Sequence, residues 1–256
     1  MQKTEYAVMY GIEDTYWWYL GLRHLLLATI RQYAVAPPPS RILDAGCGTG
    51  ALLQQCAALP ANCAGFDLFP DALAFCRQRG IERLAQASIT AIPFRTNTFQ
   101  MVLSLDALCD LPTAADVEQA LREIYRVLAP GGVLVFNLPA YAFLKSSHDY
   151  AVNNYQRFVK HRFQRQLQAL HFTIPQLTYR NTLLFPPLAV VRLWKKLQVA
   201  ANAPGSSDLA LLPRWLNTFL TKLLLAENAF LLRGGRFPFG LSLFGVARKE
   251  NRAPAQ

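Results

Sequence analysis

Three glycines at alternate positions follow a short apolar strand near the start of this chain. Residues 44–50 read Asp-Ala-Gly-Cys-Gly-Thr-Gly, and they lie between a predicted strand at 41–44 and a predicted helix at 50–59. Glycines at such a turn let the backbone bend sharply and approach a ligand without a Cβ clash. The N–H groups exposed where a helix begins favour an anionic or electron-rich group. The pattern therefore predicts a ligand-binding turn.

Strands and helices continue to alternate along the first half of the chain. The expected strands are 63–68, 82–87, 99–105 and 133–138, and the expected helices between them run from Pro70 to Gly80 and over 116–128. Short links between alternating elements are typical of a parallel sheet with helices on both faces. We therefore expect a Rossmann-like, doubly wound α/β fold with a mostly parallel sheet.

An acidic residue ends the second predicted strand. Asp67 follows Gly65 and Phe66, 21 positions after Gly46. A carboxylate at this place can accept hydrogen bonds from both hydroxyls of a ribose, as in nucleotide-binding α/β folds. Two alternatives stay open from these residues alone: a tight strand–helix turn without a ligand, and dinucleotide binding.

Residues 44–50 resemble the first motif of the class I S-adenosylmethionine-dependent methyltransferases, in which an acidic and a small residue precede G-C-G-T-G. The resemblance extends over residues 38–140 and implies S-adenosyl-L-methionine as the cofactor. The glycines are then expected under its methionine part, Asp67 at the ribose and Leu68 on the adenine. The full set of implied cofactor-binding residues is Asp44, Gly46, Cys47, Gly48, Gly50, Asp67, Leu68, Ser88, Ile89 and Leu105.

The chain departs from the family pattern at several positions. Ser88 stands where an aspartate usually contacts the adenine amino group, so a serine hydroxyl and the Ile89 N–H are expected there instead. Gln100 replaces an aspartate, and Cys109 stands where many relatives have a histidine. We interpret Cys109 as a packing residue. Asp106 is expected to shape the pocket rim rather than to take a proton, and a solvated helix cap is favoured equally.

The methyl acceptor is expected beyond the fifth strand. Methyl transfer requires alignment of the reacting groups and exclusion of water, and an oxygen or nitrogen acceptor can need a base. His148 and Asp149 form the densest polar constellation there and are the predicted catalytic residues, although a structural hydrogen bond is the alternative for His148. Tyr150 and Arg157 are expected to bind the acceptor.

A subset of these methyltransferases resembles the chain over nearly its whole length. Its members begin with an acid before Trp-Trp and carry S-x-H-D after the fifth strand, like residues 13–18 and 146–149 here. Trp17 and Trp18 are expected to contact the acceptor as an aromatic lid, or else to anchor the N-terminal helix. Asn154 and Gln156 replace a histidine and an arginine of the subset, so its acceptor chemistry does not transfer directly.

The length of 256 residues fits one methyltransferase domain over residues 1–256. Its expected parts are an N-terminal helical cap at 1–37, in which residues 5–34 are helical, a cofactor-binding core at 38–182, a helical lid or membrane-facing insertion at 183–235, and a last strand and tail at 236–256. Within the insertion, an amphipathic helix is expected at 213–232, with its apolar stripe formed by residues 216, 219, 220, 223 and 224 and with Asn217 away from it.

Charge is distributed unevenly along the chain, whose formal net charge is +10. Residues 1–140 hold ten basic and twelve acidic side chains, whereas residues 141–256 hold sixteen basic and four acidic ones. This asymmetry favours an anionic partner for the second half, such as a phosphorylated substrate or an acidic membrane surface. Nucleic acid is disfavoured because no recognition motif is present and Ser104 to Ala107 stand where a catalytic N-P-P-Y tetrad would lie.

Other features restrict the location and the chemistry. Acids occur near the N-terminus where a signal peptide needs an apolar run, and no apolar stretch reaches the ~18–20 residues that span a bilayer. We therefore expect a cytoplasmic protein, with peripheral membrane contact through the basic, apolar second half as an option. Five cysteines without a CxxC pair disfavour a disulfide framework and a zinc site, and no metal is expected.

The sequence thus predicts an enzyme that transfers a methyl group from S-adenosylmethionine to a small, hydrophobic or lipid-linked acceptor. Methylation of a soluble secondary metabolite is the close alternative. A non-catalytic module that binds the cofactor is a third. The acceptor, the atom that is methylated and the oligomeric state are left open by the sequence.

Overall fold

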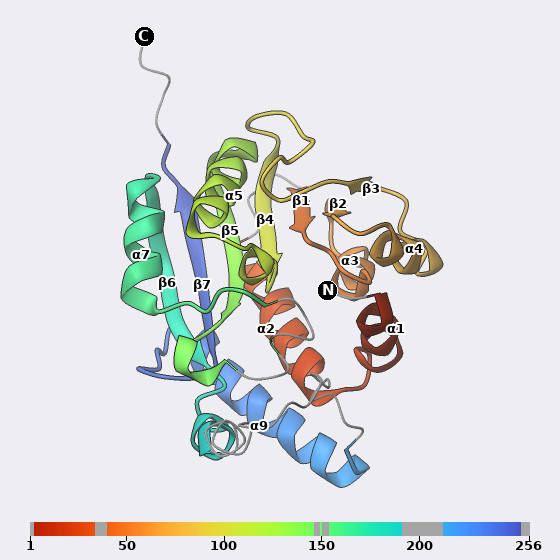
Figure 1. Cartoon of the computed structure of the whole chain (residues 1–256), viewed down its shortest axis with the longest axis vertical. Helices are drawn as coiled ribbons and strands as arrows, with labels where there is room; N and C mark the ends of the chain where they lie inside the picture. Colours follow the sequence, from red (N-terminus) through yellow and green to blue (C-terminus); the bar gives the residue numbers. More distant parts are fainter. Residues whose placement is uncertain (1–2, 34–39, 146–148, 150–153, 191–211, 252–256) are drawn as a thin grey trace.

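A twisted sheet forms the centre of the computed structural model, which describes residues 3–33, 40–145, 149, 154–190 and 212–251 (Figure 1). The strands of the described part are β1 (Ser40–Ala45), β2 (Ala61–Asp67), β3 (Leu84–Gln86), β4 (Phe99–Leu105), β5 (Leu128–Pro139), β6 (Phe172–Arg180) and β7 (Ser242–Lys249). They are ordered β3-β2-β1-β4-β5-β7-β6. β7 is antiparallel to both of its neighbours, and the other pairings are parallel. The expected doubly wound α/β fold is confirmed.

Helices cover both faces of this sheet. The helices of the described part are α1 (Lys3–Ile12), α2 (Trp17–Tyr33), α3 (Ala51–Cys56), α4 (Pro70–Gln78), α5 (Ala114–Val127), α7 (Lys160–Ala169) and α9 (Arg214–Leu232), with short 3-10 turns η1 (Leu108–Asp110) and η2 (Ala142–Leu144). α5 begins with a capping box in which Thr113 and Asp116 satisfy each other's backbone N–H groups. As expected for an insertion, α9 lies between β6 and β7 in the sequence.

The core consists of two layers because neighbouring strand residues point to opposite faces. On β4, Val102 packs in the cluster formed with α5 and α7, whereas its neighbour Met101 packs in the cluster formed with α2, α3 and the end of α9. α1 and the beginning of α2 extend past the carboxyl ends of β1 and β4. In Figure 1 these strand ends lie above the two helices. The sheet edge and these N-terminal helices line a common cavity.

Residues 5–34, which the sequence predicts to be helical, form two helices, because a turn separates α1 from α2. Neither glycine nor proline marks this break. Tertiary contacts stabilise it instead: the Trp17 N–H donates to Asn217 Oδ1 at 2.9 Å, Asn217 Nδ2 donates to the Thr15 carbonyl at 2.9 Å, and an Arg23 nitrogen donates to the Glu13 carbonyl at 2.6 Å. Groups supplied by α9 and α2 therefore satisfy backbone atoms that a continuous helix would have paired.

The apolar stripe predicted for residues 213–232 is also partly wrong. α9 packs on α2 at Gly21, where an added Cβ would lie 2.5 Å from Leu224 Cδ1, and Asn228 Nδ2 donates to the Gly21 carbonyl at 2.7 Å. Asn217 faces α2, while Phe219 is 57% exposed. Polar side chains that form hydrogen bonds with backbone groups therefore lie on the packed face together with leucines. A hydrophobic periodicity does not predict such polar positions.

Candidate functional site

A cavity of about 750 Å³ lies between the carboxyl ends of the parallel strands and the helices α1 and α2. One part is polar and includes the glycine loop after β1 and the end of β2. The other part is apolar and aromatic. Its lining on that side includes Trp17, Trp18, Tyr19, Leu22, Tyr155, Leu188 and Leu241. Sites of open α/β folds lie at this edge of the sheet.

The glycine loop turns as its sequence predicts. Gly46, Gly48 and Gly50 have φ values of +81°, +54° and +82°, a region that favours glycine. The N–H groups of Gly46 and Cys47 both donate to the Phe66 carbonyl, at 2.9 and 3.0 Å, so the loop is tied to β2. The β4–η1 segment approaches so closely that an added Cβ on Gly46 would lie 2.6 Å from Ala107 Cβ. The loop therefore has no room for a side chain at Gly46.

Asp67 lies at the end of β2 and joins three elements of the site. Its Oδ2 accepts from the Gly48 N–H at 2.9 Å, and its Oδ1 accepts from the Phe69 N–H at 3.1 Å and from the Tyr6 hydroxyl at 3.4 Å. The carboxylate borders the cavity beside Leu68, which is more than half exposed at its mouth. This is the position expected for a group that recognises a ribose.

Asp44 carries a buried carboxyl oxygen without a hydrogen-bond partner in the described structure. Its side chain borders the cavity at the end of β1. Burial and the nearby charge of Asp67 raise the pKa of Asp44 to about 7. A buried acceptor without a partner costs free energy. A ligand donor that forms a hydrogen bond with Asp44 Oδ1 would therefore recover more free energy than a bond to an oxygen that is already paired.

The remaining predicted cofactor residues also line the cavity. Ser88 and Ile89 lie on its wall after β3, and Leu105 lies at the end of β4. The Ser88 hydroxyl is 2.7 Å from the Thr90 hydroxyl and accepts from the Thr90 N–H at 3.2 Å. Serine thus takes part in a local turn where the family's aspartate would offer a carboxylate.

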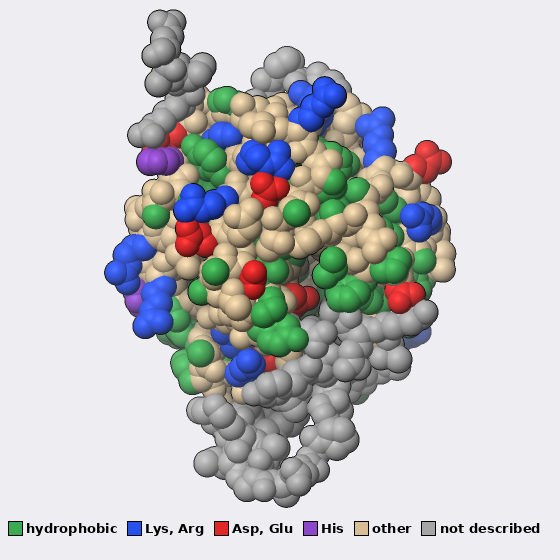
Figure 2. Space-filling view, turned by 45° about the horizontal axis from the view of Figure 1, so that its top comes forward, with side chains coloured by type: hydrophobic (Ala, Val, Ile, Leu, Met, Phe, Trp, Pro, Cys, Tyr) green, Lys and Arg blue, Asp and Glu red, His purple; other side chains and the backbone are tan. Residues whose placement is uncertain are grey.

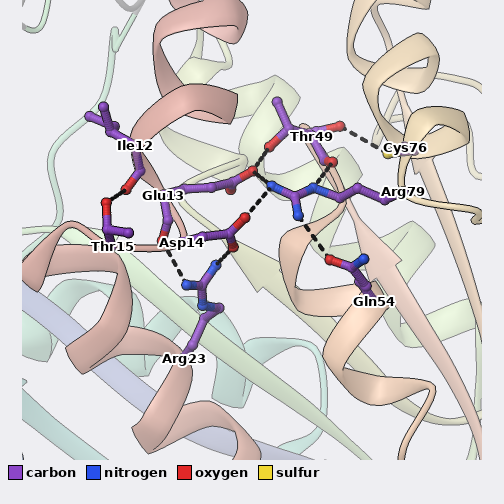
Figure 3. A network of polar contacts seen from close by, with 10 residues as sticks. Ile12, Glu13, Asp14, Thr15, Arg23, Thr49, Gln54, Cys76 and Arg79 are labelled. Carbon is purple, nitrogen blue, oxygen red and sulfur yellow. Dashed lines mark hydrogen bonds and ion pairs between the residues drawn. The ribbon is translucent and has the colours of Figure 1, made fainter.

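The N-terminal helix is fastened over the glycine loop by an ion-pair network that the sequence did not reveal (Figure 3). Arg79 Nη2 lies 2.7 Å from Glu13 Oε1 and 3.0 Å from Asp14 Oδ2, and Arg79 Nε donates to the Thr49 carbonyl at 3.1 Å. The Thr49 hydroxyl donates to Glu13, and Arg23 pairs with Asp14 at 3.1 Å. Burial raises the pKa of Glu13, although Thr49 and Arg79 act in the opposite direction. We call these five residues the N-terminal clamp.

Replacing Arg79 with alanine should loosen α1 while the rest of the fold stays intact. Removing one partner of a buried ion pair costs about 3–5 kcal/mol because the other charge is left unpaired, and the Arg79–Glu13 pair is nearly buried. Amide hydrogen exchange in residues 3–12 should accelerate by about 100-fold or more.

The matched control is Arg122→Ala, which removes an exposed arginine paired with Glu118 within α5. Exposed pairs of this kind contribute little, so exchange in residues 3–12 should be unchanged. Equal exchange in the Arg79 and Arg122 variants would show that the N-terminal clamp does not hold α1.

The positions of Trp17 and Trp18 are compatible with both expected roles, an aromatic lid and an anchor of the N-terminal helix. Both border the cavity, and their rings contact each other edge to face at 5.6 Å between centroids. Trp17 is buried and packs with Leu224 and Leu241, while Trp18 packs at the edge of the same cluster. The same two side chains therefore face the cavity and contact the core.

Asp149 and Arg157 form a buried, two-pronged ion pair on the cavity wall. Arg157 Nε donates to Asp149 Oδ1 at 3.0 Å and Nη2 donates to Oδ2 at 2.9 Å, while Nη1 donates to the Ala140 carbonyl at 2.8 Å. Asn154 Nδ2 also donates to Asp149, at 2.8 Å. This geometry favours a structural task for Asp149, the fixing of Arg157. His148 and Tyr150 lie outside the described residues.

Metal-ligand clusters and membrane-spanning helices are absent from the described residues. They contain no group of three or more His, Cys, Asp or Glu side chains placed to hold a metal ion. All five cysteines are free thiols. No helix in the described ranges combines the length and the apolar character needed to cross a membrane.

The central part of the chain is similar to known methyltransferases. Residues 43–136 match the family model described as "Methyltransferase domain". A demethylmenaquinone methyltransferase of Thermus thermophilus is 41% identical over 109 residues, which cover 40% of this chain and 48% of the relative. A malonyl-[acyl-carrier protein] O-methyltransferase of Enterobacter lignolyticus is 37% identical over 100 residues, 38% of each chain. The chain thus spans half or less of the length of these relatives.

Two solved structures show the same fold over most of the chain. One is a chain of the complex between the Haloferax volcanii Trm112 methyltransferase activator and a methyltransferase, with a TM-score of 0.63, 17% identity and coverage of 98% of this chain and 97% of that chain. The other is phosphoethanolamine N-methyltransferase 2 of Haemonchus contortus in complex with S-adenosyl-L-methionine. Its TM-score is 0.56 at 18% identity, and the match covers 89% of this chain and 52% of that one.

Proposed function

We propose that this chain, whose residues 43–136 match a methyltransferase domain model, transfers the methyl group of S-adenosylmethionine to a small, apolar or lipid-linked acceptor. One observation carries the proposal: a single cavity joins the glycine loop, Asp44 and Asp67 to an aromatic half lined by Trp17 and Trp18. A polar cofactor site and an apolar acceptor site are thus continuous.

The residues of the polar half fit the cofactor. Asp44 offers an unpartnered carboxyl oxygen to its ammonium group, and Asp67 offers a carboxylate to its ribose hydroxyls. Gly46 and Gly48 let the backbone approach without a Cβ, and Leu68, Ser88 and Ile89 border the cavity where the adenine is expected. When bound, the cofactor supplies an electrophilic methyl group on a sulfonium.

The charge of the cavity argues against an anionic group deep inside it. Seven acidic side chains line it against two arginines, Arg23 and Arg157, and each arginine pairs with a carboxylate. An anion there would meet repulsion without a free cation among the described lining residues. The aromatic half instead suits a neutral ring or chain, as the name of the demethylmenaquinone methyltransferase also suggests. A soluble secondary metabolite stays the alternative.

The acceptor-side assignments are part of this proposal. His148, whose predicted role from the sequence is acceptor binding or proton removal, is proposed here to bind the acceptor. Arg157, held by Asp149 and by the Ala140 carbonyl, presents a fixed side chain to the cavity and is proposed to orient the acceptor. Trp17 and Trp18 are proposed to exclude water from the acceptor.

The test uses cofactor with a labelled methyl group, the purified protein and an extract of the source cells. Label that partitions into the organic phase supports the proposal. Label that stays in the aqueous phase favours a polar metabolite, or a nucleic acid if nuclease treatment releases it. Cofactor binding without transfer would contradict the enzymatic proposal and favour the non-catalytic alternative.

We further propose that α9 contacts an anionic membrane, from which a lipid-linked acceptor would enter. Trp215, Phe219 and Phe230 are 70%, 57% and 47% exposed along this helix, and Arg214 and Lys222 are exposed beside them. Aromatic and basic side chains on one helix are typical of a membrane interface. On the face that Figure 2 shows, by contrast, lysines and arginines are spread among acidic and hydrophobic side chains.

A vesicle-binding measurement tests this contact. The chain should bind vesicles that contain phosphatidylglycerol, and the double change Trp215→Ser and Phe219→Ser should weaken binding by about 100-fold or more, since burying each of the two rings contributes about 1.5–3 kcal/mol. Val8→Ser, which changes an exposed apolar residue on α1, is the control. Equal binding by both variants, or none by the wild-type chain, would contradict membrane docking through α9.

A further inference from the structure

Asp106, the residue after β4, is held in an unusual conformation at the cavity wall. Its φ is +53°, a left-handed conformation that side chains other than glycine adopt at a cost. Its N–H donates to the Asn137 carbonyl at 2.9 Å, which fixes the backbone. It is not the solvated helix cap that was one expectation, because the cap residue of η1 is Ala107 and no side chain caps that turn.

The carboxylate of Asp106 has a single side-chain hydrogen-bond donor in the described structure. Asn137 Nδ2 donates to both of its oxygens, at 3.0 and 3.1 Å. A carboxylate can accept about four hydrogen bonds, so this shared donor leaves capacity on the side that borders the cavity. The adjacent residue, Ala107, packs against Gly46 of the glycine loop, which places Asp106 next to the proposed cofactor site.

A buried arginine lies behind this pair. Arg180 is fully buried at the end of β6, and its Nη1 donates to Asn137 Oδ1 at 3.3 Å. Its Nε and Nη2 have no hydrogen-bond partner in the described structure. Asn137 therefore connects Arg180 to Asp106, with its oxygen toward the arginine and its nitrogen toward the carboxylate. Burying a guanidinium with unpaired donors costs several kcal/mol, which the charges of Glu227 and Asp106 and the Trp18 ring, 5.9 Å away, partly offset.

We propose that Asp106 is the general base of this site, with Asn137 and Arg180 as the positioning residues behind it. The inference rests on the proposed methyl transfer. The proton lost by the acceptor's O–H or N–H group goes to the Asp106 carboxylate, the acceptor's electron pair forms the new bond to the methyl carbon, and the bond that breaks leaves its pair on the cofactor's sulfur. The acceptor class is thus one with an ionisable proton on the atom that is methylated.

The electrostatics of Asp106 suit this task. Burial raises the pKa of Asp106 to about 6, while the Asn137 hydrogen bond and the charges of Arg180 and Arg157 limit the rise. Asp110 and Cys109 on η1 and Tyr19 on α2 are the other titratable groups near it. A base with this pKa is ionised at neutral pH and still basic enough to accept a proton, and such bases contribute typically about 10²–10⁴-fold to a rate.

The first experiment compares Asp106→Asn with Asp110→Asn in the labelled-methyl assay on cell extract. Asp110 is the matched control, because it also has a raised pKa of about 7, and the side-chain donor beside it is the Cys109 thiol. Asp106→Asn should lower the transfer rate at least about 100-fold with S-adenosylhomocysteine affinity within about threefold, and Asp110→Asn should stay within about fivefold. Undiminished transfer by Asp106→Asn would overturn the proposal.

The second experiment needs no acceptor. The carboxyl carbon of Asp106, assigned by its loss in Asp106→Asn, should titrate near pH 6 in the ¹³C spectrum of the cofactor-free protein. Arg180→Met should move this titration upward by about one pH unit, because a stabilising positive charge is lost, and Arg180→Lys should largely restore it. The transfer rate should fall as the pH drops below about 6. The midpoint of this fall should also move upward in Arg180→Met and largely return in Arg180→Lys.

The outcomes separate this inference from the proposed function. If the wild-type chain transfers no label, the proposed function fails and the base assignment fails with it. If the wild-type chain transfers label but its transfer rate does not fall below about pH 6, only the base assignment fails. The same holds if this fall in rate is still present in Asp106→Asn. If Asp106→Asn does not fold, the wild-type titration and the Arg180 variants decide: a titration unmoved by Arg180→Met overturns the proposal.

Discussion

Replacing Asp67 with alanine should weaken the binding of S-adenosylhomocysteine by about 100-fold or more. A hydrogen bond to a charged acceptor contributes about 1.5–3 kcal/mol, and a ribose offers two hydroxyls to this carboxylate. Loss of both corresponds to at least about 3 kcal/mol, or about two orders of magnitude in affinity. The variant also loses the acceptor for the Gly48 and Phe69 N–H groups, which loosens the glycine loop itself.

Titration calorimetry of the purified variants measures this loss. Asp67→Asn keeps the shape of the side chain and one carbonyl oxygen, so its affinity should lie between that of the wild type and that of the alanine variant. Glu118→Ala removes an exposed carboxylate on α5 and should bind like the wild type. Affinity within threefold of the wild type in Asp67→Ala would show that this carboxylate does not hold the ribose.

The central sheet could be predicted from the sequence because its signals are local. Strand alternation, the glycine turn and the acid at residue 67 each lie within a short segment, and the structure shows strands β1, β2 and β4 close to their expected bounds. The break between α1 and α2 could not be predicted in this way. Its stabilising groups come from Asn217 and Arg23, and Asn217 lies some two hundred residues away in the sequence.

The candidate site likewise contains residues that a local motif predicts and residues that only the fold brings together. Asp44, Gly46 and Asp67 line the cavity as their motif predicts. Arg79 carries no motif, and only the fold brings it to Glu13 and Thr49. Asn137 lies inside an apolar strand and Arg180 is the last residue of β6, so neither stands out in the sequence as a site residue. An acid before Trp-Trp at Glu13 and Asp14 was the one signal of the N-terminal clamp, and its partner arginines were not evident.

Two glycines with the same backbone conformation face different surroundings. Gly46 has a φ of +81° and lies so close to Ala107 that an added Cβ would be 2.6 Å from its Cβ. Gly80, at the end of α4, has a φ of +76°, and nothing lies within 4 Å of an added Cβ. Alanine at either position adopts an unfavourable left-handed conformation, whereas only alanine at 46 meets a steric clash. The pair therefore separates backbone strain from close packing.

Gly80→Ala should lower the free energy of unfolding by about 1–2 kcal/mol, the cost of the left-handed conformation. Gly46→Ala should lose a further 1–3 kcal/mol or so from overpacking, because the loop is tied to Phe66 and does not recede. The midpoint of thermal unfolding should fall by about 2–4 °C per kcal/mol. Gly46→Ala should also abolish measurable S-adenosylhomocysteine binding, since relief of the clash displaces Ala107 and the loop together, while Gly80→Ala should bind normally. Equal unfolding midpoints and equal affinities in the two variants would mean that the contact between Gly46 and Ala107 shapes neither the fold nor the site.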